Sequence, residues 1–178
     1  GSLSCILLLV TVVAILGAPL IMWVFAPGFG GDPEKFNLAA DMLQITFPYL
    51  LLISLTAFAG GILNSYGAFA LSSFTPVLLN LVMIASALFL APQLDIPVMA
   101  LAWGVLIAGA AQLALQIPAL YNIGMLPRFK VAFADEGVKK IFTLMLPAMF
   151  GVSVSQINLL LDTILASFLI SGSVSWLY

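Results

Sequence analysis

Long apolar stretches alternate with short polar ones along most of the chain. No charged residue occurs in the first of them, residues 3–25. A helix of about 20 apolar residues is long enough to cross a hydrocarbon layer ~30 Å thick. The pattern predicts five spanning helices, at residues 3–25, 43–63, 72–90, 98–120 and 138–170. The fold class expected is therefore an all-α, polytopic helical membrane protein.

Prolines, glycines and charged residues mark the connections between these spans. They gather at residues 26–33, 64–67, 91–97 and 121–140, where such residues favour turns over helix. Residues 34–41 are expected to form a short interfacial lead-in, and Pro48 to kink the second span. Because the connection between the third and fourth spans is short, those two should form an antiparallel hairpin. Pro147 and Gly151 could bend the last span.

The polar stretch at 121–140 divides the helices into two groups. We expect residues 1–2 to be the remnant of a removed tag and residues 3–120 to hold four spans. Residues 121–137 would then link them to residues 138–178, which contain one long span and the beginning of another helix. The charged residues of the stretch are Arg128, Lys130, Asp135, Glu136, Lys139 and Lys140.

The positive charges favour one orientation in the membrane. With five spans, the 121–140 loop and the turn at Asn64 fall on the same side, together with four of the five Lys and Arg residues. Cytoplasmic loops carry an excess of these residues. The 121–140 loop is therefore expected in the cytoplasm, and the loops at 27–37 and 92–97 on the outer side, where Lys35 is the single cation.

Composition agrees with lipid as the solvent and excludes several functions. The chain is 63% hydrophobic and 7% charged, with a mean hydropathy of +1.24, whereas soluble domains carry about 25% charged residues. A net charge of −2 without a basic block makes a nucleic-acid partner unexpected. The absence of histidine and the single cysteine, Cys5, argue against most hydrolase mechanisms and against a zinc site.

Asp162 is the main candidate functional residue, because a charge at membrane depth costs at least about 2.5 kcal/mol and usually marks a pathway or a partner. On a helix, Asn158, Ser155 and Gly151 precede it on roughly the same face. A carboxylate with neighbouring oxygens suits Na⁺ or H⁺, so this face is expected to bind a cation and line an aqueous cavity. The alternative is an aspartate that only hydrogen-bonds between helices.

Other polar and small residues within the spans are interpreted as packing features. Neutral amides commonly join membrane helices, and cross-helix hydrogen bonding is favoured over a cavity-lining role for Gln44, Asn80, Gln112 and Gln116. Small residues allow helices to approach closely, and this role is expected for Gly60, Gly61, Gly104, Ala108 and Ala111.

Seven short strings together resemble the MurJ (MviN) family of lipid II flippases, within the superfamily of multidrug, oligosaccharidyl-lipid and polysaccharide exporters. They extend over nearly the whole chain. The strings are APGF at 26–29, TFPYLLLISL at 46–55, GILN at 61–64, PVLLN at 76–80, ALAW at 100–103, GVSVSQIN at 151–158 and SGSVSW at 171–176.

The resemblance implies a transporter of fourteen helices in two lobes, of which this chain holds the third to seventh. Residues 121–137 would be the cytoplasmic linker between lobes in the bacterial inner membrane. The family moves lipid II, the undecaprenyl-diphosphate-linked peptidoglycan precursor, from the cytoplasmic to the periplasmic leaflet by alternating access. No enzyme activity and no cofactor are implied beyond a coupling ion, Na⁺ or H⁺, and the remaining helices would be partners.

The resemblance also bears on individual residues. Ser175 matches a cavity-lining serine of the family, and Ser155 and Asn158 are expected beside it along the aqueous path. Asp162 falls where some members place a sodium ligand and others have asparagine. The family's substrate-binding arginines, on its first, second and eighth helices, have no counterpart in this chain.

Three other functions remain open from the sequence. A cation-coupled drug antiporter of the same superfamily would share the fold and the intramembrane carboxylate. A scaffold that recruits cell-wall enzymes would keep the helices without transport. A membrane-embedded enzyme is disfavoured, because histidine is absent and carboxylates are scarce.

Overall fold

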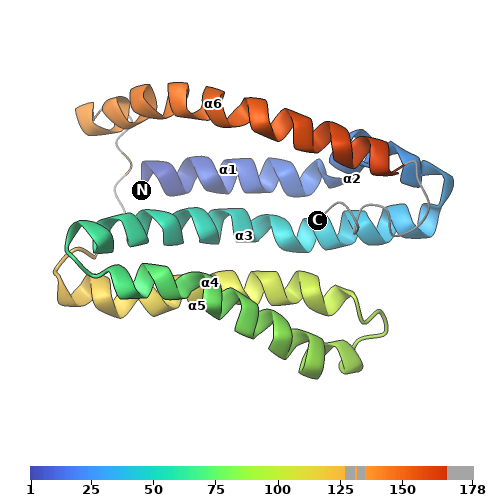
Figure 1. The fold of residues 1–178 in the computed structure, drawn as a ribbon, viewed down its shortest axis with the longest axis horizontal. Helices are drawn as coiled ribbons and strands as arrows, with labels where there is room; N and C mark the ends of the chain where they lie inside the picture. Colours follow the sequence, from blue (N-terminus) through green and yellow to red (C-terminus); the bar gives the residue numbers. More distant parts are fainter. Residues whose placement is uncertain (127–130, 132–134, 168–178) are drawn as a thin grey trace. The chain divides into compact units, whose positions relative to one another are not determined.

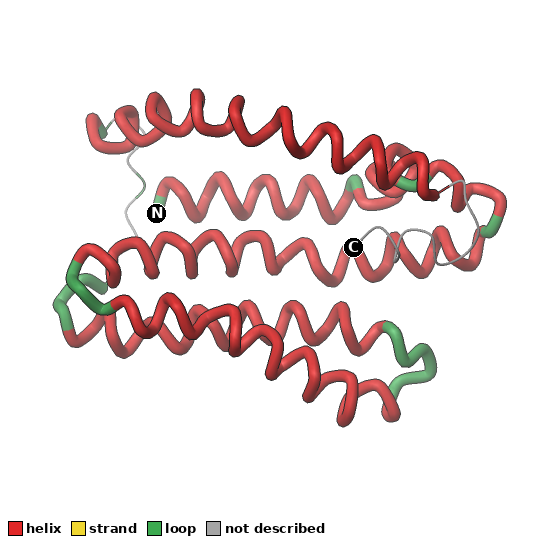
Figure 2. Tube along the Cα trace, in the orientation of Figure 1, coloured by secondary structure: helices red, strands yellow, loops and turns green. Residues whose placement is uncertain are grey.

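The computed structural model describes residues 1–126, 131 and 135–167, and every regular element among them is helical (Figure 2). Side chains at 29, 30, 142, 154, 155, 166 and 167 are outside this description. The α-helices are α1 Ser2–Leu16, α2 Ala18–Phe25, α3 Pro33–Ser65, α4 Phe69–Ala85, α5 Met99–Asn122 and α6 Glu136–Ser167. Shorter elements are the 3-10 helices η1 Pro27–Gly31 and η3 Ala91–Gln93 and the π-helix η2 Ser86–Leu90. The all-α prediction is confirmed.

Contacts divide the chain into two compact units. The first contains residues 3–15 and 42–129, that is, α1, most of α3, α4 and α5. The second contains residues 16–41 and 130–178, in which α6 contacts α2 and η1. Parts of the predicted linker, residues 127–130 and 132–134, and the predicted start of a further helix after the last span lie outside the described residues.

Four of the five predicted spans correspond to single long apolar helices, and a bent pair of helices lies at the position of the other. Four helical segments are long and apolar enough to cross a membrane: α3, residues 69–93, α5 and α6. At the position of the first predicted span, a bend of 71° at Gly17 separates α1 from α2, and the pair passes the same test of length and hydropathy only when both helices are taken together. The expected unbroken helix over residues 3–25 is therefore wrong. Pro19, in the first turn of α2, has no N–H to continue the hydrogen bonds of α1.

The interfacial lead-in and the second span form one helix, α3, and not two segments. Asp32 caps its first turn: Oδ1 accepts a hydrogen bond from the backbone N–H of Lys35 at 3.2 Å. Pro33 follows at the first helical position, where a missing N–H costs nothing. Nζ of Lys35 also lies 3.4 Å from Oδ2 of Asp32, so a hydrogen bond and an ion pair both hold the first turn of α3.

Two helices end in the same glycine motif. Gly67 after α3 has a φ of 81°, and Gly124 after α5 a φ of 70°. Behind each glycine the next N–H donates back to the helix, from Ala68 to the carbonyl of Leu63 and from Met125 to that of Leu120, both at 2.9 Å. These bonds satisfy carbonyls that the helix end leaves free. The turn predicted at residues 64–67 is thus confirmed.

Helices α4 and α5 form the expected hairpin (Figure 1). Gly104 on α5 faces the π-helix that continues α4, and a Cβ at Gly104 would lie only 2.8 Å from Oγ of Ser86. Gly109, five residues further along α5, faces α3. A Cβ at Gly109 would lie 2.6 Å from Cδ2 of Tyr49. The close approach predicted at Gly104 is confirmed, as is that at Gly60, where a Cβ would lie 3.3 Å from Cβ of Ser72. The prediction is wrong for Gly61, whose Cβ position has nothing within 4 Å, and Gly109 is a close approach that was not predicted.

Small residues fill the helix contacts while large apolar residues face outward. Among the described residues, most of the buried apolar side chains are alanines. By contrast, Leu16 is 78% exposed and Phe150 also 78%. One cluster of buried apolar side chains lies in the first unit, where Ala59 and Leu63 of α3 pack against Leu120 of α5. Such an arrangement suits a lipid environment, which rewards close backbone packing more than burial of large apolar groups.

Replacing Gly104 by alanine is expected to destabilise the full-length protein by about 1–3 kcal/mol, because the new methyl group would overlap Ser86. Chemical denaturation in mixed micelles measures the change. Gly61→Ala is the matched control, since nothing lies within 4 Å of its Cβ position, and its stability should stay within about 1 kcal/mol of the wild type. Adding Ser86→Gly should recover part of the loss; equal stability of the Gly104 and Gly61 variants would contradict the packing.

The cap of α3 should depend on pH. The backbone N–H of Lys35, which donates to the carboxylate, holds the pKa of Asp32 below its ordinary value of 3.8. A lowered pKa means that the cap contributes its full stability above pH 3.8 and loses it as the pH falls through the pKa of the folded state.

We therefore expect the hydrogen-exchange protection of the Lys35 amide, corrected for the intrinsic rate, to decrease only at acidic pH. Asp32→Asn keeps an acceptor and should remove the pH dependence, while Asp32→Ala should lower protection at every pH. Protection that is insensitive to all of these changes would show that Asp32 does not cap α3.

Candidate functional site

The predicted polar face lies on α6. Because α6 is continuous from Glu136 to Ser167, Asn158 and Asp162 lie one turn apart on the same face. Both side chains are exposed. The backbone of Gly151 and Ser155 continues this face toward the start of the helix. The structure thus brings together two of the predicted oxygen-bearing side chains, with the carboxylate on the helix surface.

Two other predicted residues are not tested by the structure. Ser155 belongs to α6, but its side chain is outside the description. Ser175 lies outside the described residues altogether. The assignment of both to an aqueous path therefore stays a prediction.

A cation at this face would have one carboxylate from the described chain. Among the residues that the structure describes, no three His, Cys, Asp or Glu side chains come together as a metal site. Na⁺ binds hard oxygen ligands, including amide and hydroxyl oxygens. Asp162 and Asn158 are of the right chemistry for Na⁺, but side chains of a single helix face cannot surround an ion. Other segments must supply the remaining ligands.

A second polar group is buried where α4 packs on α5. Gln112 and Gln116, each 1% exposed, reach across to Thr75, which is 7% exposed. Nε2 of Gln112 donates to the carbonyl oxygen of Thr75 at 2.8 Å, and Nε2 of Gln116 to its hydroxyl oxygen at 3.3 Å. The prediction that these glutamines join helices is confirmed. Their partner Thr75 was missed, since a single hydroxyl residue in an apolar span carries no distinctive signal.

The other two amides behave differently. Asn80 is exposed and Gln44 is half-buried. In the described part of the chain neither makes a cross-helix hydrogen bond, so that expectation is not met for them.

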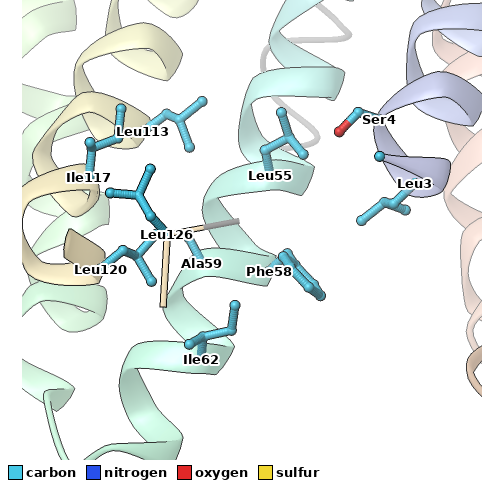
Figure 3. Close-up of a pocket in the computed structure, with 11 residues that line it drawn as sticks. Leu3, Ser4, Leu55, Phe58, Ala59, Ile62, Leu113, Ile117, Leu120 and Leu126 are labelled. Atoms are coloured by element: carbon cyan, nitrogen blue, oxygen red, sulfur yellow. The ribbon is translucent and has the colours of Figure 1, made fainter. Parts of the chain in front are cut away.

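The first unit also contains an apolar cavity of about 310 Å³ between α1, α3 and α5. Its walls are almost entirely hydrocarbon, and the hydroxyl of Ser4 is the one polar side-chain group among the labelled residues (Figure 3). Such a cavity suits an apolar chain and offers nothing to an ion. The lining residues are Gly1, Leu3, Ser4, Leu55, Phe58, Ala59, Ile62, Leu113, Ile117, Leu120 and Leu126.

Comparison with known proteins identifies the family. Residues 1–178 match the family model described as "Lipid II flippase MurJ". The chain is 51% identical over 185 residues to the "Probable lipid II flippase MurJ" of Haemophilus influenzae, and 49% identical over 185 residues to that of Vibrio cholerae. It is 43% identical over 179 residues to the "Lipid II flippase MurJ" of Burkholderia cenocepacia. These alignments cover 100%, 100% and 98% of the chain.

The chain spans only 36%, 35% and 35% of the length of these three relatives. The similarity nevertheless runs through every described helix, including α6 with Asn158 and Asp162. Together with the apolar spanning helices, it makes the chain part of a multi-pass protein of the bacterial inner membrane. The chain belongs to the lipid II flippase MurJ family.

Proposed function

We propose that this chain is part of a transporter that moves lipid II from the cytoplasmic to the periplasmic leaflet by alternating access. The match of the whole chain to a family named for this activity is the observation that carries the proposal. Since the chain spans about a third of its relatives, the activity belongs to the full-length protein. Transport requires binding and conformational change, without a covalent step.

The physical problem in flipping lipid II is its head group. The undecaprenyl tail can remain in the hydrocarbon layer of the membrane. The diphosphate and the sugar-peptide need a wet path with positive charge. The described lysines, Lys35, Lys139 and Lys140, lie near the starts of α3 and α6 and not at membrane depth. The remaining cations, Arg128 and Lys130, belong to the stretch predicted as a cytoplasmic loop. In this proposal the cationic groups that hold the diphosphate come from the other helices of the full-length protein.

Asp162 provides the coupling in this proposal. Its carboxylate, with the oxygens of Asn158 and Ser155, binds Na⁺ or a proton on the face of α6, and Ser175 lines the same aqueous path. A cation that binds one access state more tightly shifts the conformational equilibrium by the difference between its two binding free energies. The ion thereby resets the cavity after lipid II is released.

The flippase activity is tested in cells depleted of their own flippase and supplied with the full-length protein. We expect lipid II to become accessible at the outer face of the membrane, measured by a probe that cannot cross it. Absence of accessible lipid II, with the protein inserted and stable, would contradict the flippase function and favour an antiporter or a scaffold.

Asp162→Asn is expected to weaken the dependence of lipid II translocation on the cation gradient while leaving insertion and expression unchanged. Asparagine keeps the size of the side chain and removes its charge, so a structural role would be largely preserved. Asp95→Asn, the same change in the loop between α4 and α5, is the matched control and should transport as the wild type does. If the ion dependence of translocation is unchanged in the Asp162 variant, Asp162 does not bind the coupling ion and its role is structural.

A further inference from the structure

The apolar cavity of the first unit has a buried inner wall and an exposed rim. Ala59 and Leu120, which line it, are buried and belong to the packed cluster of α3 and α5. Phe58, Ile117 and Leu126 also line it, and these three side chains are exposed. The cavity is therefore a pocket that opens on the surface of the helices, and not a sealed void between them.

The cavity follows the axes of α3 and α5. Its lining residues on α3 begin at Leu55 and end at Ile62, and those on α5 begin at Leu113 and end at Leu120. A helix rises about 1.5 Å per residue, so the lined stretch of each helix is about 10 Å long. The cavity is thus an elongated space that runs along two neighbouring membrane helices for about two turns of each.

One end of the cavity lies where these helices end. α3 ends at Ser65 and α5 at Asn122, three and two residues after their last lining residues. Leu3 and Ser4 line the cavity from the beginning of α1, at the same end (Figures 1 and 3). Spanning helices end near the head groups, and each leaflet provides about half of a hydrocarbon layer ~30 Å thick. The cavity therefore lies within the hydrocarbon of one leaflet.

The walls favour hydrocarbon over water as the occupant. A buried water needs about two to four polar partners, and Ser4 provides the one polar side-chain group of the lining. An empty cavity would deprive its walls of dispersion contacts. A dry cavity of ~150 Å³ lined by similar residues binds benzene. The volume here, about 310 Å³, has room for roughly twice as many carbon atoms.

The shape of the cavity favours a lipid chain over another part of the protein. A helix with its side chains is about 10–12 Å wide, which a cavity of about 310 Å³ cannot hold. A side chain from a neighbouring spanning helix would enter across the helix axes and fill only part of the length. An acyl chain lies along the spanning helices, as the cavity does, and enters from the head-group level, where the cavity ends.

We propose that the cavity between α1, α3 and α5 binds one acyl chain of a membrane phospholipid. The chain enters at the helix ends, beside Leu126, and runs along Ala59 and Leu113 into the hydrocarbon layer. The hydroxyl of Ser4 lies at the end where the polar head group stays. The bound chain fills the space between α1 and the other two helices and becomes a structural part of the first unit. This site shares no residue with the cation face of α6.

Photolabelling of the full-length protein tests the proposal in vesicles of phosphatidylethanolamine and phosphatidylglycerol, a small part of which carries a diazirine in one acyl chain. Lipid that only surrounds the protein can reach the exposed rim but not Ala59 and Leu120, which are 4% and 2% exposed. We expect tandem mass spectrometry to find label at both, and none at Ala108, which is 0% exposed and outside the lining. Label confined to the rim would overturn the proposal and show that other parts of the protein fill the cavity.

A pair of tryptophan variants on α3 tests where the chain lies. Leu55→Trp enlarges a side chain of the lining and should abolish the label at Ala59 and Leu120, whereas Leu50→Trp, at an exposed residue outside the lining, should leave it unchanged. Label that persists in the Leu55 variant would contradict binding in this cavity. If that variant does not fold, the wild-type comparison with Ala108 still decides. Neither measurement requires transport, so the outcome is independent of the proposed flippase function.

Discussion

Lipid offers no hydrogen bonds to the polypeptide, and this constraint determines most of what the structure shows. Every backbone N–H and C=O within the membrane must find its hydrogen-bond partner in the protein, and an α-helix provides these partners within a single segment. The described residues follow this rule closely. Where a helix ends, at Gly67 and Gly124, the freed carbonyls are bonded again within the turn.

The same solvent changes how the helices are held together. Leucine and phenylalanine gain little from leaving lipid, so association depends on close packing and on polar contacts. Gly104 and Gly109 bring α5 against its neighbours at distances that no other residue would permit. The glutamines of α5 then reach Thr75. Close approach and polar bonding thus occur in the same helix hairpin, because Gly104 lets α5 approach α4 and its continuation closely while the glutamines of α5 bond to Thr75 of α4.

The two polar regions of the chain differ in exposure, and their roles differ accordingly. The amides of α5 are buried and neutral, which suits them to joining helices. Asp162 is exposed on α6 and charged, beside Asn158. A carboxylate that faced only lipid would be costly, so its place on the helix surface is consistent with a face that other helices or water complete. The residues that line the apolar cavity between α1, α3 and α5 include no amide and no carboxylate side chain.

The class of protein, four of the spanning helices and the face that carries Asp162 could be predicted before the structure was known, because they depend on hydropathy and helical spacing along one chain. The sequence also contained the motifs of the family that the comparisons then showed. The break at Gly17 was present in the sequence as Gly17-Ala18-Pro19 but was outweighed by an uninterrupted apolar run. Which small residues and which amides meet could not be predicted, since Thr75 and Gln112 are 37 residues apart in the chain and come together through helix packing.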